Sequence, residues 1–264
     1  MSFVGKKLKQ VWEDILQIDN SNTGVDSTTR VIKTGSGTST SLQLGTQKTI
    51  IEPSADSTGT FVVKDVDGNA ILTVDTTNNL VKAGVSQVSS STQYAYFGVG
   101  SSIFANVSAG THVGIPFMGF PHTSSTADNF ELGTGTDPAT SFTTAAGGNT
   151  DASIVISNVW YVPDNISIDE VVGIEGGDDA TGDTTRMHLM SYDFTSGSTS
   201  CLTNGILLAH NSDVTNAGSE QAYKSTFTVD SANVSASKVI VATFRADTVN
   251  SDYSLNITVK YHNT

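Results

Sequence analysis

Residues 253–262 have the sequence YSLNITVKYH, in which large apolar and polar side chains alternate without a break. This period of two predicts a β-strand with one buried and one exposed face. Turn-rich connections of Gly, Asn, Asp and Ser separate about eight such segments, a pattern that favours a β-sandwich or jelly roll over residues 90–264. The other strand candidates are Ala95–Val99, His112–Met118, Ile154–Val162, Ile166–Ile174, Arg186–Phe194, Tyr223–Val229 and Val239–Arg245. The long Gly- and Thr-rich connection from Thr123 to Asp151 is expected to be a loop, where a rigid β scaffold commonly carries binding residues.

A hairpin is predicted upstream, where residues 60–74 have the sequence TFVVKDVDGNAILTV. Asp67-Gly68 favours a two-residue type I′ turn, because both central positions of that turn need a positive φ. Such a turn would place Phe61 opposite Val74 and Val63 opposite Leu72. All four side chains would then share one face, so the register and the hydrophobic pattern agree.

The segment around this hairpin is poor in core-forming residues. Of the 65 residues from Ser21 to Val85, 17 are large aliphatic or aromatic. An isolated hairpin is only marginally stable in water, so these strands need a further partner. Copies of the segment wrapped around a common axis would cover the apolar faces and protect the strand edges. We therefore expect residues 21–89 to form an oligomeric shaft whose core contains Phe61, Val63, Leu72 and Val74.

The N-terminus is predicted to be an amphipathic helix from residue 2 to about residue 18. Its apolar residues recur at a helical spacing that makes one stripe. A helix of this length is marginal alone, so the stripe is expected to contact its own domain, other copies or a socket on another protein. Residues 1–20 are assigned as an anchor, with attachment or oligomerisation through Val4, Leu8, Val11, Trp12 and Ile15.

Composition and charge argue against several classes of function. The formal net charge is −13, and no Lys or Arg occurs between Lys82 and Arg186, so no nucleic-acid partner is expected. Cys201 is the only cysteine, which excludes an intramolecular disulfide and favours a small buried side chain. The apolar runs are too short to cross a bilayer, and no secretion signal is expected at the N-terminus. A virion component that is released by lysis of its host would need neither a membrane span nor a secretion signal.

Candidate chemical sites are few. The densest acidic cluster could supply oxygen ligands to Ca²⁺, although acidic glycine-containing turns are also common between strands. Its members are Glu175, Asp178, Asp179 and Asp183. The histidines (His112, His122, His188, His210 and His262) form no HxH or HExxH pattern, and His188 is expected to be a packed or an edge residue within a strand. No nucleophile elbow or phosphate loop occurs. No catalytic residue, cofactor or enzyme activity is therefore predicted, with paired carboxylates for glycoside hydrolysis left open.

Two parts of the chain resemble virion fibre proteins of tailed phages, particularly those of marine phages. The first runs from the N-terminal helix through Ile18–Asp26 and Thr29–Ile32 to the hairpin that ends with Leu72–Thr76. The second begins with Tyr161–Ile166 and Met187–Tyr192 and continues through Gly218–Tyr223 to Asn250–Tyr253, ending with Val259–His262. Together these parts cover more than half of the chain, but they assign no residue roles.

The resemblance implies a homotrimer located in the virion. Its N-terminal segment would attach to other virion proteins of the tail or capsid, and its distal β domain would face outwards towards a host surface glycan or protein. A short tail fibre, a head fibre and a capsid decoration protein all remain open. A carbohydrate-binding module is an alternative of a different class. The resulting expectation is a mainly β protein with a short N-terminal helix, a trimeric hairpin shaft and a C-terminal sandwich, without membrane insertion.

Overall fold

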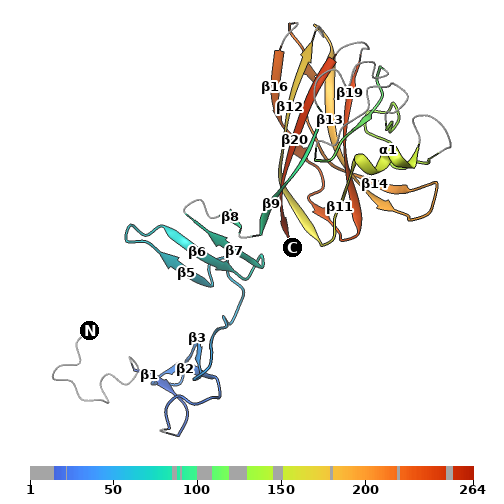
Figure 1. Ribbon diagram of the computed structural model, residues 1–264. Helices are drawn as coiled ribbons and strands as arrows, with labels where there is room; N and C mark the ends of the chain where they lie inside the picture. Colours follow the sequence, from blue (N-terminus) through green and yellow to red (C-terminus); the bar gives the residue numbers. More distant parts are fainter. Residues whose placement is uncertain are drawn as a thin grey trace. The chain divides into compact units, whose positions relative to one another are not determined.

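The computed structural model describes residues 15–21, 23–84, 88–89, 91–99, 109–118, 130–144, 151–178, 181–218, 221–247 and 252–264. The described chain is mainly β and consists of antiparallel sheets (Figure 1). It divides into two compact units, Met1–Ser91 and Thr92–Thr264. This division lies two residues beyond the boundary expected after residue 89.

The first unit begins with a four-stranded sheet of order β1-β2-β3-β4. Its strands are β1 (Leu16–Ile18), β2 (Arg30–Thr34), β3 (Ser39–Leu44) and β4 (Thr49–Ile51). Ile18 pairs with Ile32 and Leu42 pairs with Ile51, and paired residues lie on the same face of an antiparallel sheet. One face of this sheet is therefore mostly apolar.

The prediction that a helix continues to about residue 18 is wrong, because Leu16–Ile18 forms β1. Ile15 immediately precedes this strand, and the other four predicted anchor residues lie outside the described part of the chain. Ile15 and Ile18 have the spacing of three that suits a helix, whereas Leu16 and Ile18 have the spacing of two that suits a strand. Pairing with β2 decides between them, since tertiary contacts commonly override local propensity.

A second four-stranded sheet of order β5-β6-β7-β8 completes the first unit. Its strands are β5 (Phe61–Lys64), β6 (Ala70–Asp75), β7 (Leu80–Ala83) and β8 (Val88–Ser89). Phe61 pairs with Val74 and Val63 pairs with Leu72, which confirms the predicted hairpin register. Val81 pairs with Val74 from the other side and joins the same face.

The turn of this hairpin differs from the predicted type I′. Gly68 has a φ of 89°, but Asp67 is not among the residues with positive φ. The Gly68 amide donates to the Asp65 carbonyl at 3.2 Å, and the Asp65 carboxylate accepts the Asn69 amide at 2.8 Å. The Asp65 side chain thus organises a longer loop with one glycine in the left-handed region, and a register shift between Val63 and Lys64 absorbs the extra residue.

The second unit contains a five-stranded and a seven-stranded sheet. The five-stranded sheet has the order β16-β12-β20-β9, with β18 also paired to β12. Its strands are β16 (Gln221–Thr226), β12 (Ile166–Asp178), β20 (Asp252–Asn263), β9 (Thr92–Val99) and β18 (Asn233–Val234). The seven-stranded sheet has the order β10-β19-β13-β14-β17, with β11 on β19 and β15 on β13. Its strands are β10 (Val113–Ile115), β19 (Lys238–Ala246), β13 (Thr184–Phe194), β14 (Leu202–His210), β17 (Thr228–Val229), β11 (Val159–Tyr161) and β15 (Val214–Thr215).

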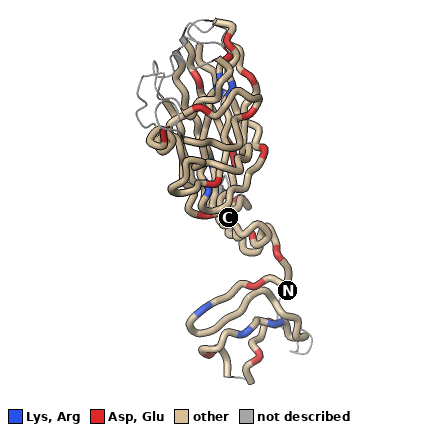
Figure 2. Tube along the Cα trace, turned by 90° about the vertical axis from the view of Figure 1, so that its right-hand side faces the viewer, with Lys and Arg blue, Asp and Glu red and all other residues tan. Residues whose placement is uncertain are grey.

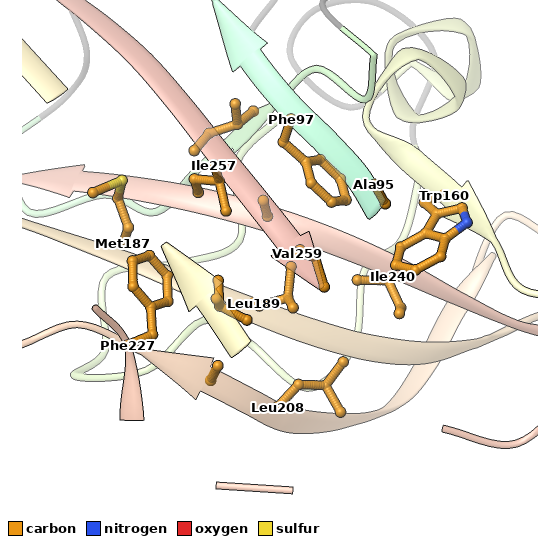
Figure 3. Close-up of a cluster of buried hydrophobic side chains, with 14 of the residues drawn as sticks. Ala95, Phe97, Trp160, Met187, Leu189, Leu208, Phe227, Ile240, Ile257 and Val259 are labelled. Carbon is orange, nitrogen blue, oxygen red and sulfur yellow. The ribbon is translucent and has the colours of Figure 1, made fainter. Parts of the chain in front are cut away.

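The two sheets of the second unit share one apolar core (Figure 3). The predicted alternation of the last strand is confirmed, since Tyr253, Leu255, Ile257 and Val259 are all buried. A second apolar cluster packs on the opposite face of the seven-stranded sheet, against α1 (Ala152–Ser157) and residues 130–144. The seven-stranded sheet is therefore covered on both faces.

Three strand predictions in the second unit need correction. Residues 154–157 belong to α1, and only Val159–Tyr161 of that candidate is a strand. The candidate Tyr223–Val229 is divided between β16 and β17, which belong to different sheets. β14 was not predicted, because Asn204-Gly205 resembles a turn; Asn204 does adopt a positive φ of 52°, but the strand continues through it.

Both units of the described chain carry an excess of negative charge. Acidic residues outnumber basic ones in both units (Figure 2), in line with the net charge of −13. The described residues include no helix that is long and apolar enough to span a membrane.

Replacing Phe97 by Ala should destabilise the second unit strongly. Phe97 is 1 % exposed and belongs to the shared core, and truncation of such a side chain costs about 3–5 kcal/mol. Tyr96→Ala is the matched control, since Tyr96 is 49 % exposed on the opposite face of β9 and should change stability by less than about 0.5 kcal/mol. Urea unfolding of both variants measures the difference, and equal losses would contradict this account of β9.

Candidate functional site

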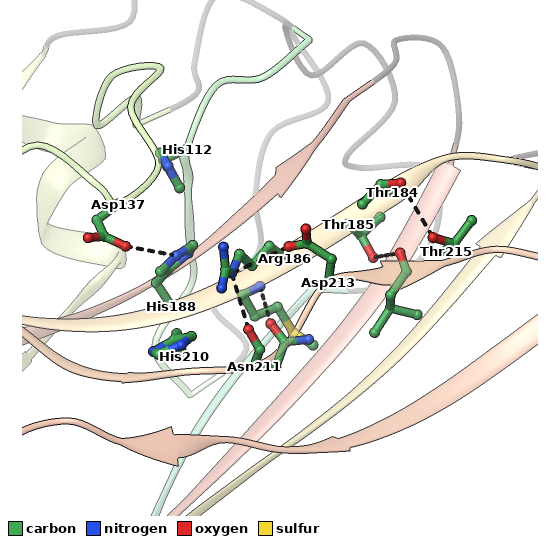
Figure 4. A network of polar contacts seen from close by, with 12 residues as sticks. His112, Asp137, Thr184, Thr185, Arg186, His188, His210, Asn211, Asp213 and Thr215 are labelled. Atoms are coloured by element: carbon green, nitrogen blue, oxygen red, sulfur yellow. Dashed lines mark hydrogen bonds and ion pairs between the residues drawn. The ribbon is translucent and has the colours of Figure 1, made fainter.

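The most unusual polar cluster in the second unit lies on the outer face of the seven-stranded sheet (Figure 4). His188 on β13 is fully buried, and His112, which directly precedes β10, is also fully buried. Their rings meet edge to face with centroids 4.8 Å apart. His210 at the end of β14 pairs with His188 across the sheet, with ring centroids 6.3 Å apart.

Residues 130–144 close this cluster from outside. The amide of Leu132 donates to the His112 carbonyl at 2.7 Å, and His112 Nε2 lies 3.0 Å from the Gly135 carbonyl oxygen. Asp137 from the same segment places Oδ1 3.6 Å from His188 Nε2, too far for a hydrogen bond. Neither ring nitrogen of His188 has a hydrogen-bond partner among the described residues, and neither does His112 Nδ1.

Both buried histidines are neutral near pH 7. Burial lowers the pKa of His188 to about 3, and the neighbouring His112 lowers it further. Burial also lowers the pKa of His112. The Asp137 carboxylate is more than half exposed and therefore screened by water, so it does not compensate the loss of hydration of His188. With no access to solvent, His188 serves to fill space rather than to exchange protons with a ligand.

A second polar feature lies between the two sheets, around Glu175 on β12. Thr185 Oγ1 donates to Glu175 Oε1 at 2.8 Å, while Glu175 Oε2 and Asn216 Nδ2 have no hydrogen-bond partner among the described residues. A cavity of about 10 Å³ touches both residues, which is room for about one water molecule. A water there could donate to Glu175 and accept from Asn216. Burial raises the pKa of Glu175 to about 7, and the hydrogen bond from Thr185 opposes this shift only in part.

The proposed acidic cluster is not gathered into a metal site in the described structure. Glu175 points into the interior, and Asp183 is 5 % exposed and accepts the Tyr253 hydroxyl at 2.5 Å. The side chain of Asp178 and all of Asp179 lie outside the described residues. Within the described ranges no group of three or more His, Cys, Asp or Glu side chains is arranged to hold a metal ion.

The remaining candidates are more superficial. His210 Nδ1 lies 2.7 Å from Asp230 Oδ2, and His262 Nδ1 lies 2.8 Å from Asp169 Oδ1. An open hollow of about 320 Å³ separates α1 from the β13–β14 connection, and buried Cys201 lies at its base. His122 lies outside the described residues. The prediction that His188 is packed within a strand, and that Cys201 is buried, is confirmed.

Sequence analysis missed the contact between His112 and His188 and the buried state of Asp75 in the first unit. Asp75 is 1 % exposed and bonds Lys82 at 3.0 Å and Asn78 at 2.9 Å, which hold its pKa down at about 2. The signal for Asp75 was present as Asp75-Thr-Thr-Asn78, a side-chain-capped turn. No local signal could place His112 against His188, because they are 76 positions apart.

Comparison with known proteins does not assign the chain to a family. No protein-family model matches the chain, and no curated protein matches its sequence.

Replacing His188 by Phe should flatten the acid dependence of stability. The folded pKa of about 3 lies below the unfolded value near 6.5, so the unfolded chain takes up a proton first and stability falls as pH drops through this range. Removing the imidazole should reduce the slope between pH 6 and pH 4 by about 1.4 kcal/mol per pH unit. Met190→Leu, a buried change on the same strand, controls for repacking. Parallel pH profiles for wild type and His188→Phe, measured by urea unfolding, would contradict the neutral assignment.

Replacing Glu175 by Gln should stabilise the protein above neutral pH. The folded pKa of about 7 exceeds the unfolded value of 4.5, so the folded state retains a proton that the unfolded chain releases, and stability falls as pH rises between these values. Glutamine keeps an acceptor for Thr185 but cannot ionise. The free energy of unfolding should therefore gain about 3 kcal/mol at pH 8 relative to pH 5. Glu170→Gln removes an exposed carboxylate from the same strand, and an equal response of both variants would count against a buried, protonated Glu175.

Proposed function

We propose that this chain is a structural virion protein of a tailed phage, a short homotrimeric fibre. Its N-terminal segment attaches to tail or capsid proteins, and its C-terminal β unit, a sandwich of the jelly-roll kind, contacts the host surface. The observation that carries the proposal is the contrast between two uncovered apolar sheet faces in the first unit and the complete core of the second.

The first of these faces belongs to the β1–β4 sheet. Ile32 is the only large hydrophobic residue that is buried among the described residues of the first unit, at 6 % exposure. Leu16 is 63 % exposed and Ile51 is 39 % exposed on the same face. The large apolar residues on this face are Leu16, Ile18, Ile32, Leu42, Leu44 and Ile51, and Arg30, Thr34 and Thr49 share the face with them.

The second face belongs to the β5–β8 sheet and contains the predicted shaft core. Its members are Phe61, Val63, Leu72, Val74 and Val81. None of them is fully buried, and Phe61 and Val81 are 37 % and 40 % exposed. The opposite face holds the buried Asp75, which bonds Lys82 and Asn78, and three large apolar residues, Val62, Ile71 and Leu80. The face that contains Phe61 is therefore the more apolar of the two.

Other copies of the same chain would be sufficient to cover these two apolar faces. Each residue of a large aliphatic or aromatic type contributes about 1.5–3 kcal/mol when its side chain is fully removed from water. Of the eleven such residues on these two faces, all except Ile32 are only partly covered. Neither apolar cluster of the protein contains a described residue of the first unit. Three chains around one axis would bury both faces and create an elongated shaft without open, flat apolar surface.

The second unit supports the proposed contact with the host surface, because its apolar core is complete within one chain. Two packed sheets and an outer layer give it a core that needs no other chain. Such a scaffold can present a rigid surface away from the particle. A capsid decoration protein with the same fold is the alternative, and the number of copies per particle separates the two: tens indicate a fibre and hundreds indicate decoration.

The purified chain should have a mass of about 83 kDa in solution, three times the 27.6 kDa of one chain. Phe61→Lys should shift it towards the monomer, because a charge would enter the shared apolar face. Val62→Lys is a close control, since Val62 has the same 37 % exposure on the opposite face of β5. Light scattering after size exclusion measures both variants. A monomeric wild type, or equal dissociation of both variants, would contradict the shaft.

Removal of residues 1–15 should leave this trimer intact but prevent its incorporation into particles. The cut lies before β1, so both sheets of the first unit remain complete. Particles assembled with the truncated chain, and probed with an antibody against the second unit, test the attachment role. Incorporation at the wild-type level would show that the anchor lies elsewhere.

A further inference from the structure

The outer face of the five-stranded sheet is a second exposed surface, and its side chains form ordered rows across the strands. Tyr96 on β9 is opposite Thr258 on β20, which is opposite Val172 on β12. One row further along β9, Tyr94 is opposite Lys260, which is opposite Glu170. The next row in the other direction contains Gly98, Asn256 and Ile174.

Tyr94 and Tyr96 are the dominant features of this face. They are 52 % and 49 % exposed, although they alternate along β9 with fully packed Ala95 and Phe97. Residues two apart on a strand are about 6.7 Å apart on the same face, so the two rings stand side by side along the strand. The backbone below them is fixed on both edges, since β9 pairs with β20 and the Met118 amide donates to the Tyr96 carbonyl at 2.7 Å.

Polar groups surround the two rings within one strand spacing. They are the amide of Asn256, the hydroxyl of Thr258, the ammonium of Lys260 and the carboxylate of Glu170. No described residue forms a hydrogen bond or ion pair with any of these four side chains, so their hydrogen-bonding capacity faces solvent. Gly98, two residues from Tyr96 on the same face, adds no side chain opposite Asn256. The rings and polar groups are therefore displayed by a rigid sheet.

We propose that this Tyr94–Tyr96 face binds a polysaccharide chain that carries no net charge, running along β9. Sugars present C–H groups that pack against the electron-rich face of an aromatic ring, and hydroxyl groups that both donate and accept hydrogen bonds. This face supplies aromatic rings for the C–H groups and polar side chains for the hydroxyl groups. One acidic and two basic residues, Glu170, Lys260 and Lys224, leave its charge nearly balanced, which gives a polyanion little advantage.

A second copy of the chain fits this face less well. Obligate subunit interfaces resemble a protein core, whereas here every row combines Tyr, Val or Ile with at least one of Thr, Asn, Lys and Glu. Rigid tyrosines beside short polar side chains are instead typical of recognition surfaces. The inference deepens the host-contact part of the proposed function and rests on it only for its biological setting.

The test is affinity electrophoresis of the full chain through gels that contain a neutral polysaccharide, with backbones of glucose, mannose, xylose or galactose tried in turn. A sulfated polysaccharide serves as the polyanionic comparison. At least one neutral polymer should retard the wild type. Tyr94→Ala and Tyr96→Ala should each weaken this retardation by about tenfold, and the double variant should abolish it.

Tyr161→Ala is the matched control, because Tyr161 is 56 % exposed but lies on β11 of the other sheet. It should retain binding. Absence of retardation in every neutral gel, retardation only by the sulfated polymer, or equal loss in Tyr161→Ala would overturn the proposal.

The solution mass is measured on the same samples. Dissociation of the Tyr94 and Tyr96 variants would mark the face as a subunit interface and also overturn it. A trimer that binds no polysaccharide would leave the fibre proposal standing while this inference fails.

Discussion

The pleat of β20 is the constraint on which the second unit depends. It sends Leu255, Ile257 and Val259 into the core between the two sheets and leaves Asn256, Thr258 and Lys260 outside. Because β20 pairs with β12 on one side and β9 on the other, the same alternation is imposed on both neighbours. A register slip by one residue would exchange the buried and exposed sets on this strand. The pairing of β20 with β12 and β9 thus determines which side chains form the core and which side chains, Tyr94 and Tyr96 among them, form the exposed face.

Buried polar groups modify this simple division. His188 and Glu175 are buried and keep unpaired nitrogen or oxygen atoms, and burial favours the uncharged form of each. Their effects on stability have opposite signs with pH: the contribution of neutral Glu175 is lost as pH rises from 4.5 towards 7, whereas the cost of keeping His188 neutral appears as pH falls from 6.5 towards 3. The combined contribution of the two groups is therefore most favourable between pH 4.5 and pH 6.5.

The two units obtain stability in different ways. The second buries its apolar residues within one chain, in two clusters on either side of the seven-stranded sheet. The first has sheets of four short strands whose apolar faces stay partly exposed. Isolated small sheets of this kind need additional packing to be stable. This distribution of apolar residues supports the proposed self-association through the first unit.

The sequence alone determined the β character, the alternation of β20 and the register that joins Phe61 to Val74, because a period of two and a turn signal are local properties. It failed where local signals were ambiguous or misleading: residues 16–18 suited a helix, Asn204-Gly205 concealed β14, and residues 154–157 form α1. Only the tertiary structure decided that His112 meets His188, that Glu175 is buried, and that Tyr94 and Tyr96 stand exposed. The physical reason is that alternation specifies which side chains share a face, whereas burial depends on which distant segment covers that face.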